Sequence, residues 1–355
     1  MKEIIINEKN AGGRLDKICF KYLDKASSGF IYKMLRKKNI TLNDKKASGG
    51  EIVQAGDSVK FYLSDETVAK FKSGLSVSEG RRSDAMRRAG DNETTRAEGR
   101  TGRTAAGMKN GLTLSLKNMI VFEDECIVAV NKPAGLLSQK AKPEDTSVND
   151  FILEHVPGDD LFTPGIANRL DRNTSGIILA GRNLNSSREL NKAIAGRDIS
   201  KKYLTLVVGE ISQEARIDAY LLKDEKSNIV RVSSEESAGG DHIITAYKPL
   251  AVADGFTLLE VDLITGKSHQ IRAHLSSIGH PVVGDTKYGD DTVNAQFKDK
   301  YNLRYQLLHA YRIEFISAGG ILEYLNGTVI EAPVPVMFRK VLEGEGIWQP
   351  GAPEA

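Results

Sequence analysis

The pattern of apolar and polar positions predicts a small unit of helices and strands at the start of the chain. In residues 14–25 apolar side chains recur every three or four positions, the spacing of an amphipathic helix. Ser27 suits the N-cap of a second helix. Two short runs at residues 40–43 and 59–63 have the composition of strands and are bounded by polar turns. These elements predict a first domain over residues 1–65.

The pattern disappears in the next part of the chain. Between residues 76 and 107 the only sizeable apolar side chains are Val77 and Met86, set among small and polar residues and seven arginines. So few apolar groups cannot offset the entropy that a chain loses when it becomes ordered. We therefore predict a flexible basic linker over residues 66–112. Its arginines could touch RNA, and a solvated linker is the plainer alternative.

From about residue 113 the pattern returns and indicates a second domain that extends to residue 350. Strands outnumber helices, and strand and helix do not alternate regularly, so the expected fold class is α+β. Strands are predicted at residues 120–130 (two, joined by an acidic turn), 177–180, 203–209, 256–263 and 306–316, and helices at residues 148–155 and from about residue 268.

Composition agrees with a two-domain protein that works in water. The chain has 355 residues, too many for one small core, and 40% are hydrophobic and 27% charged. Cys19 and Cys126 lie far apart in apolar surroundings, which favours a reducing compartment. No run of about 18 apolar residues exists, so no membrane span is expected. The start of the chain is too charged for a signal peptide, and the expected location is the cytoplasm.

Positive charge is concentrated in the first domain. Residues 14–46 contain ten Lys or Arg side chains against three Asp. Such a surface suits the phosphate backbone of RNA, and a solvated charged face is the alternative. Residues 12–63, from Gly-Arg-Leu-Asp-Lys to Gly-Asp-Ser-Val, resemble the alpha-L RNA-binding domain. The candidate RNA-binding residues are Arg14, Lys17, Lys33, Arg36, Lys37 and Lys38.

One acidic residue in the second domain is a candidate for chemistry. Asp171 lies between Arg169 and Arg172, just before the apolar run at residues 177–180. Nearby positive charge stabilises a carboxylate anion, which could then act as a nucleophile or a base without a metal. A loop in which these charges pair only for structure is the alternative.

The histidines give a weaker lead. His269 and His274 are five residues apart, not the four of a zinc-binding helix, and no carboxylate accompanies them. The sequence also lacks Gly-rich phosphate loops of Walker or Rossmann spacing and a Ser nucleophile elbow. We therefore expect neither a metal nor a cofactor.

Five motifs, in order along the chain, resemble those of the RluA-type pseudouridine synthases. The first is Asn-Arg-Leu-Asp-Arg-Asn-Thr-Ser-Gly at residues 168–176, in which Asn168 stands where that family usually has His. The resemblance runs over residues 113–345. It implies a catalytic domain built on a mixed or antiparallel sheet, with flanking helices and a central active-site cleft. The other motifs are at residues 202–209, 265–274 (with Lys267–Ser268 where Arg is common), 283–289 and 307–310.

The resemblance also implies roles for individual residues. Asp171 would be the catalytic carboxylate, Arg272 its ion-pair partner, and Tyr203 the ring that stacks on the target base. The target uridine would leave its stack to reach the site, and Arg169 would occupy the space it leaves. The substrate-binding residues would be Arg169, Arg172, Lys202, Ile271 and Leu308.

The implied reaction is the isomerisation of uridine to pseudouridine, without metal, cofactor or energy source. With an alpha-L domain in front, the expected target is large-subunit (23S) ribosomal RNA or the assembling subunit, and the expected state is a monomer. Transfer RNA is the alternative target. A non-catalytic RNA-binding or ribosome-assembly factor is the alternative function. A third possibility, a metal-dependent hydrolase that uses the histidines, would be excluded by full activity in excess chelator.

Overall fold

The computed structural model describes five stretches of the chain, residues 1–8, 10–72, 118–224, 229–233 and 240–347. Most of the expected linker, residues 73–112, lies outside the described residues. The chain divides into two compact units, Met1–Ile6 with Gly13–Leu114, and Asn7–Gly12 with Ser115–Ala355.

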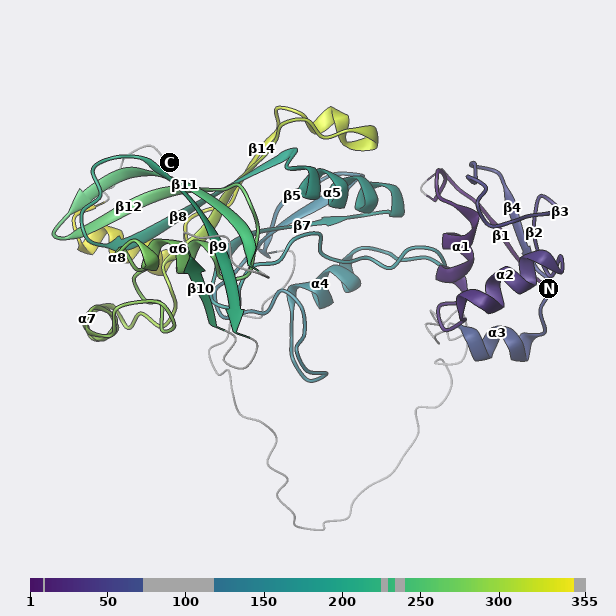
Figure 1. The fold of residues 1–355 in the computed structure, drawn as a ribbon, viewed down its shortest axis with the longest axis horizontal. Helices are drawn as coiled ribbons and strands as arrows, with labels where there is room; N and C mark the ends of the chain where they lie inside the picture. Colours follow the sequence, from purple (N-terminus) through teal and green to yellow (C-terminus); the bar gives the residue numbers. More distant parts are fainter. Residues whose placement is uncertain (9, 73–117, 225–228, 234–239, 348–355) are drawn as a thin grey trace, which may run out of the picture. The chain divides into compact units, whose positions relative to one another are not determined.

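The first unit combines, in its described residues, a small antiparallel sheet with three helices (Figure 1). The strands lie in the order β1-β4-β2-β3. Helices α1 and α2 bury Leu15, Ile31 and Leu35. Ser27 caps α2 as expected, because its hydroxyl accepts a hydrogen bond from the Phe30 backbone N–H at 3.3 Å. The elements are β1 (Lys2–Ile5), α1 (Leu15–Tyr22), α2 (Ser28–Arg36), β2 (Ile40–Leu42), β3 (Lys45–Lys46), β4 (Ser58–Phe61) and α3 (Asp65–Phe71).

This unit continues past the boundary expected at residue 65. The Phe71 ring packs on Phe30 with centroids 4.4 Å apart, and the Phe71 carbonyl accepts a hydrogen bond from the Lys25 backbone N–H at 3.0 Å. Val68 is also buried. Helix α3 therefore belongs to the unit rather than to a linker. Helix α3 has only seven residues, too few for the spacing of apolar positions to predict a helix.

The second unit is built on one large sheet with helices on both faces (Figure 1). Its described residues form ten strands in the order β10-β9-β11-β12-β8-β13-β7-β6-β5, with β14 beside β13. Every pair is antiparallel except β7–β13, so the sheet is mixed. The strands are β5 (Ile120–Glu123), β6 (Ile127–Lys132), β7 (Ser175–Gly181), β8 (Ile199–Val208), β9 (Ala215–Asp224), β10 (Ile229–Ser233), β11 (Asp241–Ala253), β12 (Phe256–Leu263), β13 (Leu308–Phe315) and β14 (Val329–Glu331). The helices are α4 (Val148–His155), α5 (Leu184–Gly196), α6 (Gln270–Ser277), α7 (Asp291–Tyr301), η2 (Gly320–Leu325) and α8 (Val336–Gly344).

The parallel pair brings the segment that follows Asp171 against β13, and a glycine makes this approach possible. Gly176 has φ +119°, and a Cβ at this position would lie 2.2 Å from the Ala310 carbonyl oxygen. Next to it, Ser175 Oγ lies 2.9 Å from His309 Nδ1. Burial lowers the pKa of His309 to about 4, so the ring is neutral. Its Nε2 donates to the Ala332 carbonyl at 3.2 Å, and its Nδ1 therefore accepts the Ser175 proton.

The side chains of β8 alternate between two cores because successive strand residues point to opposite faces. Tyr203 and Val207 pack in a cluster that includes residues of α4 and α6. Leu204 and Leu206 pack on the other face with residues of α7 and α8. Helix α5 and η2 cover a further cluster over β6, β7 and β13.

Several elements lie where the pattern predicted them. Helix α4 has the expected bounds, residues 148–155. Helix α6 begins at Gln270, close to the expected start. Strand β8, in contrast, begins at Ile199, well before the expected 203–209. None of the helices in the described ranges is long and apolar enough to cross a membrane.

Candidate active site

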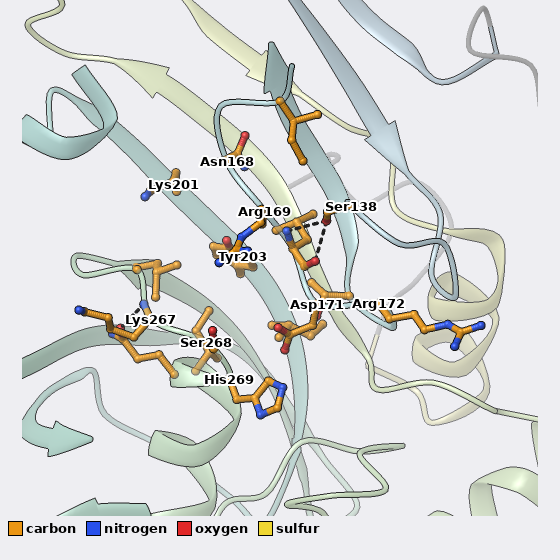
Figure 2. Close-up of a pocket in the computed structure, with 18 of the residues that line it drawn as sticks. Ser138, Asn168, Arg169, Asp171, Arg172, Lys201, Tyr203, Lys267, Ser268 and His269 are labelled. Atoms are coloured by element: carbon orange, nitrogen blue, oxygen red, sulfur yellow. Dashed lines mark hydrogen bonds between the residues drawn. The ribbon is translucent and has the colours of Figure 1, made fainter. Parts of the chain in front are cut away.

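A cleft of about 820 Å³ opens on the face of the large sheet that carries Tyr203 (Figure 2). Its lining includes the loop before β7, two residues of strand β8, the turn that leads into α6, and residues 137–140. These segments are far apart in the sequence, and the sheet brings the first two together because β13 lies between β7 and β8. The lining includes Asp171, Tyr203 and Arg272, the three residues expected to act in catalysis.

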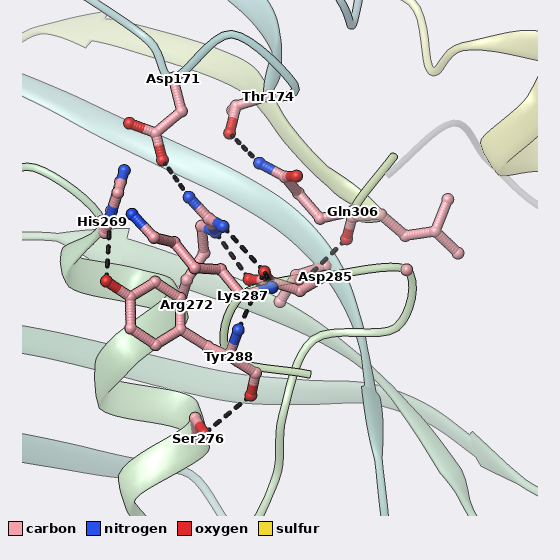
Figure 3. A network of polar contacts seen from close by, with 12 residues as sticks. Asp171, Thr174, His269, Arg272, Ser276, Asp285, Lys287, Tyr288 and Gln306 are labelled. Atoms are coloured by element: carbon pink, nitrogen blue, oxygen red, sulfur yellow. Dashed lines mark hydrogen bonds and ion pairs between the residues drawn. The ribbon is translucent and has the colours of Figure 1, made fainter. Parts of the chain in front are cut away.

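Arg272, on the first turn of α6, links two carboxylates (Figure 3). Its Nη1 donates to Asp171 Oδ2 at 2.9 Å, while its Nε and Nη2 donate to Asp285 at 2.6 and 2.8 Å. The Arg272 side chain is 8% exposed, against 25% for Asp171 and 0% for Asp285. Burial alone would lower the pKa of Arg272, but the hydrogen bonds and charges of the two carboxylates raise it overall.

Asp285 is the anchor of this arrangement. Its carboxylate also accepts hydrogen bonds from the backbone N–H groups of Lys287 and Tyr288, at 2.9 and 3.1 Å. Burial would raise the pKa of Asp285, but Arg272 and these N–H groups lower it overall. Asp171 is bound less completely, because its second oxygen has no hydrogen-bond partner among the described residues.

Tyr288 supports the guanidinium group of Arg272. The guanidinium carbon lies 5.1 Å from the centre of the Tyr288 ring, a cation–π distance. The Tyr288 hydroxyl accepts a hydrogen bond from the Val230 N–H at 3.0 Å and lies 2.9 Å from His269 Nδ1. Burial lowers the pKa of His269, so the ring is neutral at neutral pH and its Nδ1 can accept the Tyr288 proton.

The loop that carries Asp171 is held by side chains that the motifs did not single out. Lys132 is completely buried at the end of β6 and donates from Nζ to three backbone carbonyls at 2.9 to 3.1 Å, one of them that of Arg172. Burial lowers the pKa of Lys132 to about 7, against the opposing charge of Asp171. The Ser138 hydroxyl donates to the Leu170 carbonyl at 2.7 Å. A lysine at the end of a buried apolar strand is the sequence feature that could have revealed the first of these contacts.

Tyr203 and two aliphatic side chains form the apolar part of the lining. Tyr203 is 5% exposed, and Ile271 and Leu308 are each 4% exposed. Burial raises the pKa of Tyr203, and the negative charge of Asp171 raises it further. The phenol is therefore neutral at neutral pH. It can stack on a base or donate a proton, but its phenolate is not available as a base.

Arg169 and Arg172 both line the cleft and are exposed. The sequence suggested that these two residues hold the carboxylate between them. In the structure the ion-pair partner of Asp171 is Arg272, and the Arg172 Nε donates instead to the Gly135 carbonyl at 3.1 Å. Neighbours on an extended loop point away from one another, whereas Arg272 comes from a different element.

Asn168, the departure from the family motif, also lines the cleft. Its amide behaves like an additional strand residue beside β7. The side-chain oxygen accepts from the Leu179 N–H at 2.7 Å, and the side-chain nitrogen donates to the Ile177 carbonyl at 3.2 Å. An amide at this position thus fixes the start of the loop that carries Asp171.

The structure places Lys202, one of the residues expected to bind substrate, outside the lining of the cleft. Its Nζ donates to Glu260 at 2.9 Å on the face of the sheet opposite the cleft. Lys201, one residue earlier, lines the cleft together with Tyr203. Lys202 was expected because residues 202–209 resemble a family motif, but the period of two counted back from Tyr203 places Lys201, not Lys202, on the cleft face.

Comparison with known proteins agrees with this arrangement. A profile of the RNA pseudouridylate synthase family matches residues 126–277. The ribosomal large subunit pseudouridine synthase C of Vibrio parahaemolyticus is 27% identical over 340 residues, which are 96% of this chain and 95% of that relative. The tRNA pseudouridine synthase C of Vibrio vulnificus is 33% identical over 238 residues, which are 63% of this chain and 94% of that relative. The chain belongs to the RluA-type pseudouridine synthase family.

The predictions of this family and of an RNA-modifying isomerase are thereby confirmed. The fold agrees as well. The solved structure of human RNA pseudouridylate synthase domain containing 4 superimposes with a TM-score of 0.54 at 21% identity, covering 66% of this chain and 96% of that one. That likeness establishes the pseudouridine synthase fold of the second unit, with its mixed sheet and flanking helices.

The two histidines considered as metal ligands, His269 and His274, each form a hydrogen bond with a side chain of this pseudouridine synthase. His274 is buried with its Nδ1 2.8 Å from the Thr245 hydroxyl, and burial lowers the pKa of the ring to about 4. His269 bonds Tyr288 as described above. Throughout the described part of the chain, no three His, Cys, Asp or Glu side chains lie together so as to hold a metal ion.

The basic residues of the first unit of the synthase differ in their surroundings. Arg14 is 53% exposed and pairs with the buried Asp16 at 2.8 Å, so it already has a structural partner. Asp16 also accepts a hydrogen bond from the Tyr32 hydroxyl at 2.7 Å. The other five candidates are exposed and form no ion pair with the described residues; they are Lys17, Lys33, Arg36, Lys37 and Lys38.

Proposed function

We propose that this pseudouridine synthase converts specific uridines of large-subunit ribosomal RNA to pseudouridine, with Asp171 as the catalytic carboxylate. One observation carries the assignment of Asp171. Its carboxylate faces the cleft with one oxygen fixed by Arg272 and the other free of hydrogen bonds to described residues. An anion that is both oriented and partly open is what attack on a sugar or base, or removal of a sugar proton, requires.

The reaction is an isomerisation, and its atoms balance within the nucleotide. The bond from the ribose C1′ to the uracil N1 breaks, the base turns, and C1′ joins the uracil C5, whose proton is lost while N1 gains one. In our proposal Asp171 acts on the ribose or the base during this exchange. Arg272 keeps Asp171 ionised and oriented in a half-buried site, where an unpaired carboxylate would be costly.

The base would be held by the apolar part of the cleft. Tyr203 would stack on the uracil, an interaction that contributes roughly 1–3 kcal/mol per base. Its neutral hydroxyl could also donate a proton late in the reaction. Ile271 and Leu308 would contact the remaining surface of the base. The uridine must leave its helix to reach this depth, at a cost of a few kcal/mol, and exposed Arg169 would occupy the space it leaves.

Two observations support ribosomal rather than transfer RNA as the substrate. The match to the ribosomal large subunit enzyme covers 96% of this chain and so includes the first unit. The match to the tRNA enzyme covers 63% of this chain although it spans 94% of that relative. The first unit would serve as an alpha-L RNA-binding domain, with the exposed lysines and arginine on and after α2 contacting phosphates. We also propose that the enzyme acts as a monomer.

The test is carbodiimide primer extension on ribosomal RNA from cells that lack this protein. The strains are complemented with wild type or with Asp171→Asn, which keeps the shape of the side chain. The expected result is a set of stops that returns only with wild type, at the uridines that the enzyme modifies. Both proteins are quantified on immunoblots, so that a missing stop reflects missing chemistry.

Two other results would change the proposal. Stops that are the same in all strains on ribosomal RNA but depend on the wild-type protein in transfer RNA would move the substrate to transfer RNA. Stops restored equally by Asp171→Asn would refute the role given to Asp171, because an amide can neither attack nor take up a proton.

A further inference from the structure

Lys201 is a half-buried lysine that faces the active-site cleft from β8 (Figure 2). It precedes Tyr203 by two residues, so the alternation of the strand places both side chains on the same face. Its Nζ lies at the turn that leads into α6, because a Cβ on Gly266 would be only 3.7 Å from it. The ammonium group therefore lies in the same cleft as Tyr203, the ring proposed to stack on the target base.

The other basic side chains of the cleft differ from Lys201. Lys140 pairs with Asp150 at 3.1 Å, and Lys267 pairs with Asp241 at 2.5 Å. Arg272 is paired with two carboxylates, as described above. Arg169 and Arg172 are exposed to solvent, and Arg172 also donates to the Gly135 carbonyl. Lys201 alone among the cationic side chains of the cleft is shielded from water and has neither a hydrogen bond nor an ion pair with a described residue.

A shielded ammonium group without a partner is costly, because burial removes water that nothing replaces. Burial accordingly lowers the pKa of Lys201, and only the more distant charge of Asp262 opposes this effect. Such a group gains most when an anion arrives. Uracil and ribose are neutral, so the anion that an RNA strand brings into the cleft is a phosphate.

We infer that Lys201 binds a backbone phosphate next to the target uridine and so sets how deeply the nucleotide enters the cleft. This inference rests on the proposed function in one respect, that an RNA strand occupies the cleft. A phosphate contact carries no sequence information. Lys201 would therefore contribute to the affinity of every substrate site equally, while contacts elsewhere choose the uridine.

The experiment is a double-mutant cycle between the protein and the RNA. Lys201→Met keeps the length of the side chain and removes its charge. A methylphosphonate, placed in turn at the phosphate 5′ and 3′ of the target uridine, removes the charge of the RNA. Dissociation constants are measured on the Asp171→Asn background, where turnover does not consume the RNA. The RNA is a fragment around a uridine found by primer extension, or a uridine-containing stem-loop if none is found.

For Lys201→Met we expect binding to weaken by roughly tenfold, as for one charge-assisted contact. We also expect the slope of log affinity against log salt to fall by about 0.7. At one of the two positions, the methylphosphonate should weaken wild-type binding by a similar factor and leave Lys201→Met almost unaffected. Lys201→Arg should retain most of the affinity. Lys202→Met is the matched control, because the neighbouring lysine points to the opposite face, and it should bind like wild type.

Stability separates this role from a structural one. Removing an unpaired half-buried charge should leave the Tm of Lys201→Met equal to or above that of wild type. A lower Tm together with weaker binding would overturn the inference, and Lys201→Gln gives a second, polar replacement if the methionine variant does not fold. If the loss of affinity caused by Lys201→Met simply adds to that caused by the methylphosphonate at both positions, Lys201 contacts neither phosphate. This result would overturn the inference and leave the proposed function intact. If Lys201→Met and a methylphosphonate are coupled but the wild-type protein forms no pseudouridine, the proposed function is refuted and the inference stands.

Discussion

The two carboxylates bound to Arg272 show how one guanidinium group serves structure on one side and chemistry on the other. Asp285 has no exposed surface and accepts hydrogen bonds from two nitrogens of Arg272 and from two backbone N–H groups. Asp171 is 25% exposed and accepts from one nitrogen of Arg272. The fully satisfied carboxylate fixes the arginine, and the arginine then fixes the less satisfied one.

This difference indicates how the site can be rigid and still reactive. A carboxylate with all its acceptor positions filled is a poor nucleophile and a poor base, since any reaction must first break those hydrogen bonds. Asp285 meets that description. Asp171 accepts one hydrogen bond from Arg272, which orients it, and its other oxygen remains available to the substrate. Replacing each residue separately tests whether the two roles are divided in this way.

The largest effect is expected on activity, from Asp171→Asn. The amide keeps the shape of the side chain but cannot attack or take up a proton, so the rate of pseudouridine formation should fall by about 10⁴-fold or more. Because the side chain is partly exposed and makes one hydrogen bond, the free energy of unfolding should change by no more than about 1 kcal/mol. Single-turnover assays and urea unfolding measure the two quantities. If Asp171→Asn greatly lowers the free energy of unfolding, Asp171 also serves the structure, and the two carboxylates do not divide structure and chemistry between them.

Asp285→Asn should have the reverse profile, with its main effect on folding. It leaves the buried guanidinium of Arg272 without its two-fold partner, and breaking such a pair costs about 3 kcal/mol or more. Activity should fall by about 10²-fold, because Arg272 can then rotate away from Asp171. Urea unfolding and steady-state assays check this. If the variant unfolds like wild type, Asp285 is not the anchor.

The residues of this site differed in how far the sequence revealed them. Asp171, Tyr203 and Arg272 could be named because each lies in a motif that resembles a known family. Their contacts could not, since Asp171 and Arg272 are 101 residues apart and no periodicity connects them. Asp285 lies inside another matched motif, between Gly284 and a turn, yet nothing in the pattern identifies its partner.

The fold was predictable where one apolar stripe or run defines an element. Helix α4 has the expected bounds for that reason. Strands β9 to β11 were not predicted, although in β9 the apolar residues Ile217, Ala219 and Leu221 alternate with polar ones, which is the pattern of a strand with one buried face. Lys202 was named from the motif that resembles a known family, yet the alternation of β8 gives the place in the cleft to Lys201, two residues before Tyr203.

A smaller effect is expected in the dependence of stability on pH. The pKa of Asp285 is lower in the folded protein than in the unfolded chain, where it is about 3.9. Its stabilising contribution is therefore complete above that value and is lost as the pH falls through the folded pKa. The difference in unfolding free energy between wild type and Asp285→Asn should therefore shrink as the pH falls below about 4, measured by urea unfolding. A constant difference would mean that the charge of Asp285 does not stabilise the fold.

The smallest effect is expected from Tyr288, whose ring lies against the Arg272 guanidinium that binds both carboxylates. Tyr288→Phe keeps the ring over the guanidinium of Arg272 but removes the hydroxyl that bonds His269 and the Val230 N–H. Leaving that N–H without its partner should cost about 1 kcal/mol of stability. Activity should fall only severalfold, because the two bonds from Arg272 to Asp285 remain. A loss as large as that of Asp285→Asn would show that the position of Arg272 depends on the hydroxyl network as much as on its carboxylate anchor.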